Sequence, residues 1–260
     1  MRFEELTSPE VAALDRDRTV LLLPVGSVEQ HGNHMPLGTD TLLAHHVSLA
    51  AADALAGRVA VLPPPWYGFS AHHMRFPGSI TLRAETLMAV VEDIVGSLVQ
   101  HGFRRVLIVN GHGGNNGVID VLASTLGHRH YGKARIAALT YFQLAREAIA
   151  GMRLSGSGGM GHACEFETSM IQHLRPELVK MGSARTTYPD PGSRYLTTDL
   201  LGGSAIRVYH DFGDLSPSGT LGDPSLASPE HGAAFFSAVV AELAAFLEDF
   251  AGWSIREPRP

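Results

Sequence analysis

Glutamate, histidine and aspartate lie close together in one polar stretch, residues 26–40, directly after an apolar run at residues 20–25. Alternate side chains of an extended segment share a face, so Glu29 and His31 are expected to point the same way. Glycines and a proline follow and would turn the chain, which could return Asp40 toward this pair. Two carboxylates and an imidazole suit a divalent metal, although the same residues could form a solvated loop that caps the next helix.

A second polar group, Asn110 to Asn115, follows another apolar run at residues 105–109. A glycine-rich loop of this kind could present His112 to a metal, bind an anion through backbone N–H groups, or be a plain turn. It matches neither the dinucleotide-binding pattern nor the P-loop, and it lacks the lysine of the latter. We therefore favour His112 as a metal ligand.

The third polar group is His162 to Ser169, which contains two glutamates. On a continuous helix from 162, Glu165 would face the same side as His162 and Glu167 would face elsewhere, but a helix that begins near Cys164 removes this constraint. One glutamate could bind metal and His162 could transfer protons. An acidic helix N-terminus, favoured by the helix dipole, explains the pattern equally well. We interpret Cys164 as a packing residue rather than a nucleophile.

The elements that must position these groups alternate between strand and helix. Strands are predicted at 20–26, 58–62, 105–109 and 134–140, and helices at 9–16, 41–56, 85–100, 118–126, 162–174 and 229–250. This order predicts an α/β fold, a three-layer α/β/α sandwich with a mostly parallel central sheet. Ligands of such sheets bind outside the carboxyl ends of the strands, so the first two polar groups are expected to meet there.

Composition narrows the class of protein. The chain has 260 residues with 45% hydrophobic and 18% charged, and we expect a single domain over residues 1–260 because no linker divides it. A formal charge of -6 argues against a nucleic-acid or membrane partner. One cysteine, no apolar signal core and no run of membrane-spanning length predict a cytoplasmic protein.

Together the motifs resemble the creatininase (creatinine amidohydrolase) family. The resemblance extends from about residue 20 to the final helix, and four ordered motifs make it specific. The matching segments are Gly26–Gly32 with Asp40, His73 with Phe76-Pro77-Gly78-Ser79, Asn110–Asn115 and His162–Ser169, and Gly222-Asp223-Pro224 resembles a late family motif. Membership would imply a layered α/β/α fold, a two-metal hydrolytic site and a homohexamer.

The resemblance implies a role for each metal ligand. Glu29, Asp40 and His112 would hold one metal, and His31 with a bridging Asp40 would hold the second. Creatininase itself supplies a further glutamate two residues after the loop histidine, where this chain has a glycine. Relatives with the Gly-His-Gly-Gly-Asn sequence use the glutamate before Thr-Ser, which is Glu167 here.

The same resemblance implies that His162 is the proton-transfer histidine. Two neighbours differ from the family pattern: Gly161 replaces the glutamate of creatininase, and Cys164 replaces the usual glycine. The expected catalytic residue is therefore His162, and the expected metal ligands are Glu29, His31, Asp40, His112 and Glu167.

The activity implied by the resemblance is metal-dependent hydrolysis of an amide or cyclic amide C–N bond in a small molecule. Two divalent ions, zinc or manganese and alternatively iron, would activate water and the scissile carbonyl. A creatininase-like peptidase of mycofactocin maturation, or a hydrolase of a carbon–carbon bond in an oxidised cyclitol, would share the metal site. A non-catalytic, metal-stabilised scaffold is the alternative from another class.

Overall fold

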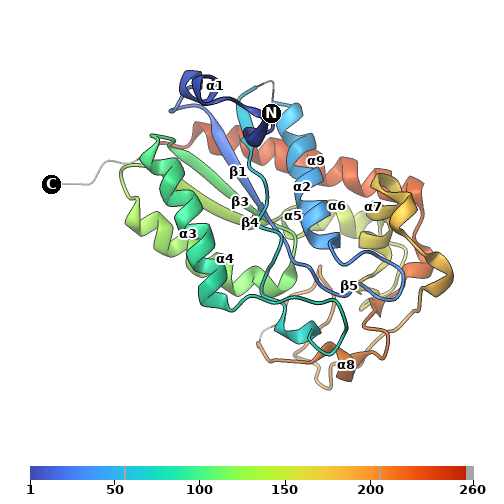
Figure 1. Cartoon of the computed structure of the whole chain (residues 1–260). Helices are drawn as coiled ribbons and strands as arrows, with labels where there is room; N and C mark the ends of the chain where they lie inside the picture. Colours follow the sequence, from blue (N-terminus) through green and yellow to red (C-terminus); the bar gives the residue numbers. More distant parts are fainter. Residues whose placement is uncertain (56, 205, 256–260) are drawn as a thin grey trace.

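A parallel sheet lies at the centre of the protein (Figure 1). The computed structural model describes residues 1–55, 57–204 and 206–255. Its four-stranded sheet has the order β2-β1-β3-β4, and every neighbouring pair is parallel. The strands are β1 (Val20–Val25), β2 (Val59–Val61), β3 (Arg105–Asn110) and β4 (Arg135–Thr140). The four strands predicted from the apolar runs are confirmed, with ends that differ by one residue.

Helices cover both faces of this sheet, which confirms the three-layer α/β/α sandwich (Figure 1). One layer contains α3 (Ala84–Gln100) and α4 (Asn116–Arg129), and the other contains α2 (Thr39–Asp53), α7 (Glu165–Leu174) and α9 (Pro229–Gly252). Alternate residues of β1 enter the two cores: Leu22 packs toward α2 and α9, and Leu21 toward α3 and α4. This two-sided burial explains the continuous apolar composition of β1.

Pro24 lies inside β1, where its missing N–H would ordinarily break the ladder. The backbone of the even-numbered residues points toward β2, since Val20 N donates to Arg58 O at 3.0 Å and Leu22 O accepts from Leu62 N at 2.8 Å. The β1–β2 register ends at Leu22, so the nitrogen of Pro24 faces a position beyond β2. The proline therefore costs no ladder bond and marks where the chain begins to leave the sheet.

Shorter elements complete the fold: α1 (Ser8–Ala13), α5 (Tyr141–Leu144), α6 (Arg146–Met152), α8 (Phe212–Leu215) and an antiparallel pair, β5 (Met160–His162) with β6 (Leu221–Gly222). The helix predicted over 162–174 begins only at Glu165, because His162 belongs to β5. The predicted end of α2 at Ala56 lies outside the described residues.

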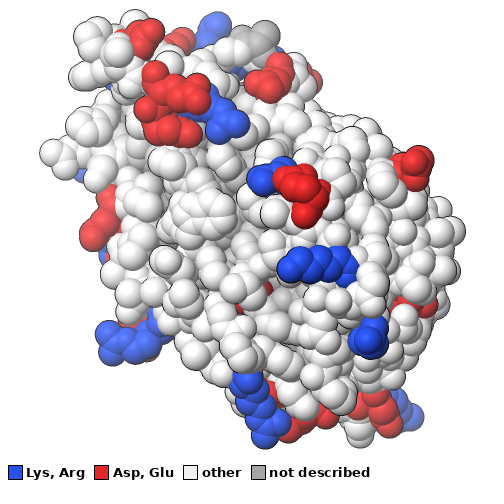
Figure 2. All heavy atoms as spheres, turned by 45° about the vertical axis from the view of Figure 1, so that its right-hand side comes forward, with Lys and Arg blue, Asp and Glu red and all other residues white. Residues whose placement is uncertain are grey.

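Charge is distributed unevenly over the surface. On the face in Figure 2, Lys and Arg lie in small groups beside Asp and Glu, separated by broad uncharged areas. A face that binds nucleic acid typically carries a continuous basic patch instead. Among the described residues, none of the helices combines the length and apolar composition needed to cross a membrane.

Candidate metal centre

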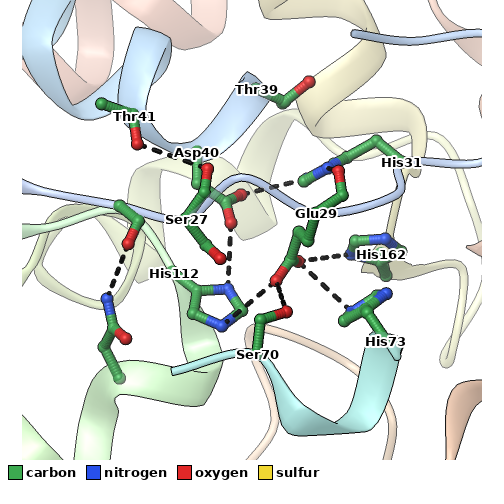
Figure 3. A network of polar contacts seen from close by, with 12 residues as sticks. Ser27, Glu29, His31, Thr39, Asp40, Thr41, Ser70, His73, His112 and His162 are labelled. Carbon is green, nitrogen blue, oxygen red and sulfur yellow. Dashed lines mark hydrogen bonds and ion pairs between the residues drawn. The ribbon is translucent and has the colours of Figure 1, made fainter. Parts of the chain in front are cut away.

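Two loops and the first turn of a helix converge at the carboxyl edge of the sheet (Figure 3). The loop after β1 supplies Glu29 and His31, the first turn of α2 supplies Asp40, and the loop after β3 supplies His112. Asp40 lies between two imidazoles: His31 Nε2 is 3.0 Å from its Oδ1, and His112 Nδ1 is 2.9 Å from its Oδ2. His112 Nε2 is 3.3 Å from Glu29 Oε2. The polar groups that follow β1 and β3 therefore meet at the carboxyl ends of the strands, as expected from the sequence.

Two glycines allow these loops to approach α2 closely enough. A Cβ atom at Gly26 would lie 2.5 Å from the Cα of Thr41, and one at Gly111 would lie 2.6 Å from the carbonyl oxygen of Asp40. Any other residue type would push the loop away from the first turn of α2. Asp40 meets the strand-end residues because both loops have glycine at the point of contact.

The start of α7 adds Glu167 and, just before it, His162. Glu167 Oε1 lies 3.8 Å from His31 Nε2. Glu165 faces away, because its carboxylate accepts hydrogen bonds from the amides of Leu154 at 2.7 Å and Ser155 at 2.8 Å. His162 and Glu165 do not share a helical face, since the helix begins after Cys164.

His162 is oriented by the loop after β1. Its Nε2 lies 2.6 Å from the carbonyl oxygen of Gln30, and its Nδ1 lies 3.7 Å from Glu29 Oε1. Because Nε2–H donates a hydrogen bond to this carbonyl, the neutral ring presents an unprotonated Nδ1 to the cluster. Burial lowers the pKa of His162 well below its usual value, and the charge of His31 acts in the same direction.

All six predicted residues are buried, each with at most 6% of its surface exposed. Candidate ligand atoms of His31, Asp40 and Glu167 lie within 4.8 Å of one another, and so do those of Glu29, His72 and His112. Imidazole nitrogens and carboxylate oxygens that share a desolvated space fit a divalent ion such as zinc or manganese. The side chains present therefore suit the kind of ion that the sequence predicts.

The charges of these residues depend on one another. Burial alone would raise the pKa of Asp40, but the charges of His31 and His112 hold it well below its usual range. Burial opposes a charge on His112, yet Glu29 and Asp40 outweigh it and raise its pKa to about 9. Burial raises the pKa of Glu29 to about 7. Without metal, protonated imidazoles therefore balance the carboxylates, and a bound cation would take over that role.

Four neighbours were not predicted as site residues. Ser70 donates to Glu29 Oε2, and His73 Nε2 lies 3.3 Å from Glu29 Oε1. The ring of His72 stacks on that of His112 with centroids 5.5 Å apart, and the Phe212 ring of α8 lies 4.8 Å from His72. The two adjacent histidines before Phe-Pro-Gly-Ser were an available signal, whereas nothing in the sequence distinguishes Phe212.

Cys164 is fully buried, and burial raises the pKa of its thiol well above the usual value. A thiol held neutral is a poor nucleophile. These properties support its interpretation as a packing residue.

A layered α/β/α fold with buried imidazoles and carboxylates at the carboxyl edge of its sheet is the arrangement of a metal-dependent hydrolase. The sequence profile of the creatininase family, described as creatinine amidohydrolase, matches residues 4–247. The chain belongs to the creatininase family and is a metal-dependent amidohydrolase.

Named relatives match most of this chain. A mycofactocin precursor peptide peptidase of Mycobacterium ulcerans (strain Agy99) is 34% identical over 229 residues, which are 85% of this chain and 81% of that protein. Creatinine amidohydrolase of Pseudomonas putida is 32% identical over 175 residues, 62% of this chain and 66% of that protein. A solved manganese creatininase superposes with a TM-score of 0.79 at 29% identity and covers 96% of this chain and 98% of its own.

Proposed function

We propose that this amidohydrolase cleaves an amide or cyclic amide C–N bond of a small molecule with two divalent metal ions. The observation that carries the proposal is the convergence, from separate parts of the chain, of Glu29, His31, Asp40, His112 and Glu167 around one buried space next to His162. A non-catalytic scaffold would need the ligands alone. The buried histidine that faces them with an unprotonated nitrogen favours catalysis.

The ligands divide into two sets that share Asp40. Its Oδ2 lies beside His112, which also contacts Glu29, and its Oδ1 lies beside His31, which also approaches Glu167. A carboxylate that contacts a different imidazole with each oxygen is suited to bridge two ions. We assign Glu29, Asp40 and His112 to one ion and His31, Asp40 and Glu167 to the other, with zinc or manganese as the metal.

When bound, such ions supply Lewis-acid activation of water and of the scissile carbonyl. The chain itself handles the protons. His162 keeps Nε2–H on the Gln30 carbonyl, accepts a proton at Nδ1 from the attacking water, and delivers it to the nitrogen of the leaving group. Burial keeps this ring neutral in the resting protein, so its Nδ1 carries no proton before the reaction.

A peptide amide is the second candidate substrate. The relative that matches 85% of this chain is named a peptide peptidase, and a peptide bond is also a C–N amide. The same ligands and the same proton transfer would serve both substrates, so residues outside the proposed ligand set would have to discriminate between them. Assembly as a homohexamer, implied by the family resemblance, stays a prediction that light scattering coupled to size-exclusion chromatography can test.

Metal analysis combined with activity tests the proposal. We expect about two equivalents of zinc or manganese per chain, and less than one in Asp40→Ala, because the shared carboxylate serves both ions. Hydrolysis of a panel of lactams, hydantoins and peptides should disappear on chelation and return with added metal. Full activity without metal, or unchanged metal content in Asp40→Ala, would refute the dinuclear site.

A further inference from the structure

The short turn η2 (Ala71–His73) places a histidine inside the protein beside the carboxylate of Glu29. His73 is 0% exposed, and neither of its ring nitrogens forms a well-aligned hydrogen bond within the described residues. Its Nε2 lies 3.3 Å from Oε1 of Glu29 (Figure 3). Buried polar groups are nearly always paired, so this orientation calls for a reason.

Residues of one turn contact both carboxylate oxygens of Glu29. Ser70, directly before η2, donates its hydroxyl proton to Oε2, and His73 faces Oε1. Residues three apart in a 3₁₀ turn lie on the same side of it. One turn therefore directs a hydroxyl and an imidazole nitrogen, two potential hydrogen-bond donors, toward the two oxygens of one carboxylate.

The position of the His73 ring is fixed by its surroundings. The amide of His73 donates to Ser70 O at 3.1 Å, and that of Phe76 donates to His73 O at 2.9 Å. The rings of His162 and Phe212 both lie 4.4 Å from it, centroid to centroid.

We propose that His73 is a positioning residue whose Nε2 faces Oε1 of Glu29 and which, together with Ser70, fixes this carboxylate in its metal-binding orientation. The inference rests on the proposed function in one respect, namely that Glu29 is a metal ligand. Hydrogen-bond partners of metal ligands typically change metal affinity about 10–100-fold when they are removed. His73 itself stays outside the ligand set.

Two isosteric amides separate this role from a merely structural one. In His73→Gln an amide N–H can reach the place of Nε2, whereas in His73→Asn it can reach only the place of Nδ1. Competition of Zn²⁺ with a chromophoric chelator should show the affinity of His73→Asn lowered about 10–100-fold, with the stoichiometry unchanged. His73→Gln should retain the wild-type affinity. The control is His101→Gln, at an exposed histidine that caps α3 at the opposite end of the sheet.

The visible spectrum of the Co²⁺-loaded proteins gives a second readout, expected to change in His73→Asn and to be restored in His73→Gln. Equal zinc affinity of His73→Asn and wild type would overturn the inference, and loss of a whole ion would make His73 a ligand. If the variants at 73 do not fold, Ser70→Ala should lower the affinity, and no change there would overturn the two-donor arrangement. A wild-type protein that binds no zinc would contradict the proposed function itself.

Discussion

Gly114 is the position where the family resemblance implies a metal-binding glutamate in creatininase, and in this structure a side chain there would collide with its neighbours. A Cβ atom at this position would lie 2.6 Å from the carbonyl oxygen of Phe69 and 2.7 Å from Cε1 of His72, and it would collide with Nε2 of His112. The Phe69 oxygen belongs to the backbone and cannot swing away. Gly114→Ala must therefore displace the loop or the ring of His112, which this carbonyl binds at 3.0 Å.

These contacts predict that Gly114→Ala lowers both the thermal stability and the metal affinity of the protein. Overpacking of this kind costs about 1–3 kcal/mol, and each kcal/mol lowers the unfolding midpoint of a chain of this size by about 2–4 °C. A displaced His112 ring also loses its 2.9 Å contact with Asp40 and its 3.3 Å contact with Glu29. We therefore expect metal affinity to fall at least about 10–100-fold, the range seen when the support of a ligand is removed.

The assay compares metal affinity, metal content and thermal unfolding of Gly114→Ala with those of Gly113→Ala. The control lies in the same turn, and a Cβ atom at Gly113 would meet no atom within 4 Å. A second arm places glutamate at 114 in a Glu167→Ala background, which imitates the ligand arrangement of creatininase. We expect no recovery of the second ion there. Wild-type metal affinity in Gly114→Ala, or rescue by glutamate at 114, would refute the reasoning.

Three further results are expected. His162→Gln should lower turnover about 10²–10⁴-fold while both ions stay bound, and near-normal turnover would remove His162 from the mechanism. Metal uptake at pH 7 should release protons, because the pKa of His31 is raised and that of His112 is raised to about 9. Calorimetry in buffers of different ionisation enthalpy measures this release. The number of protons released should decrease above pH 9. Creatinine should be a poor substrate in steady-state assays, because Gly114 and Gly161 replace two acidic residues of creatininase; turnover that rivals the best amide substrate would contradict this.

The central sheet was predictable because its strands are short apolar runs that end in glycine, proline or polar residues. The strands β5 (Met160–His162) and β6 (Leu221–Gly222) were not, since two or three residues carry no periodicity. Their pairing depends on contacts between distant parts of the chain. The start of α7 was predicted too early because β5 could not be predicted. His162 belongs to β5, whereas the sequence pattern placed it in the helix.

Some residues of the candidate site could be predicted from the sequence, and others could not. Glu29, His31 and His112 follow strands of a parallel sheet, so a topological rule brings them together before any side chain is considered. Ser70 and His73 come from the short 3₁₀ turn η2 and the residue before it, inside a long loop, and the return of this loop to Glu29 depends on contacts such as the 2.9 Å hydrogen bond from the Phe69 amide to Asn115 Oδ1. No local pattern encodes such a bond, although the adjacent histidines marked the loop as unusual.

Ala163 explains how His162 and Glu167 come to face the same space. Among the described residues it is the one non-glycine residue with a positive φ, +51°, a conformation that costs an L-residue about 1–2 kcal/mol. This turn separates β5 from α7, and its amide donates to Glu167 Oε2 at 2.6 Å, so the distorted backbone also holds the glutamate. The family glycine that follows is Cys164 here, which has an ordinary φ of -95° and needs no glycine. The strained position is therefore Ala163, and cysteine at position 164 leaves the reversal of the chain between His162 and the helix intact.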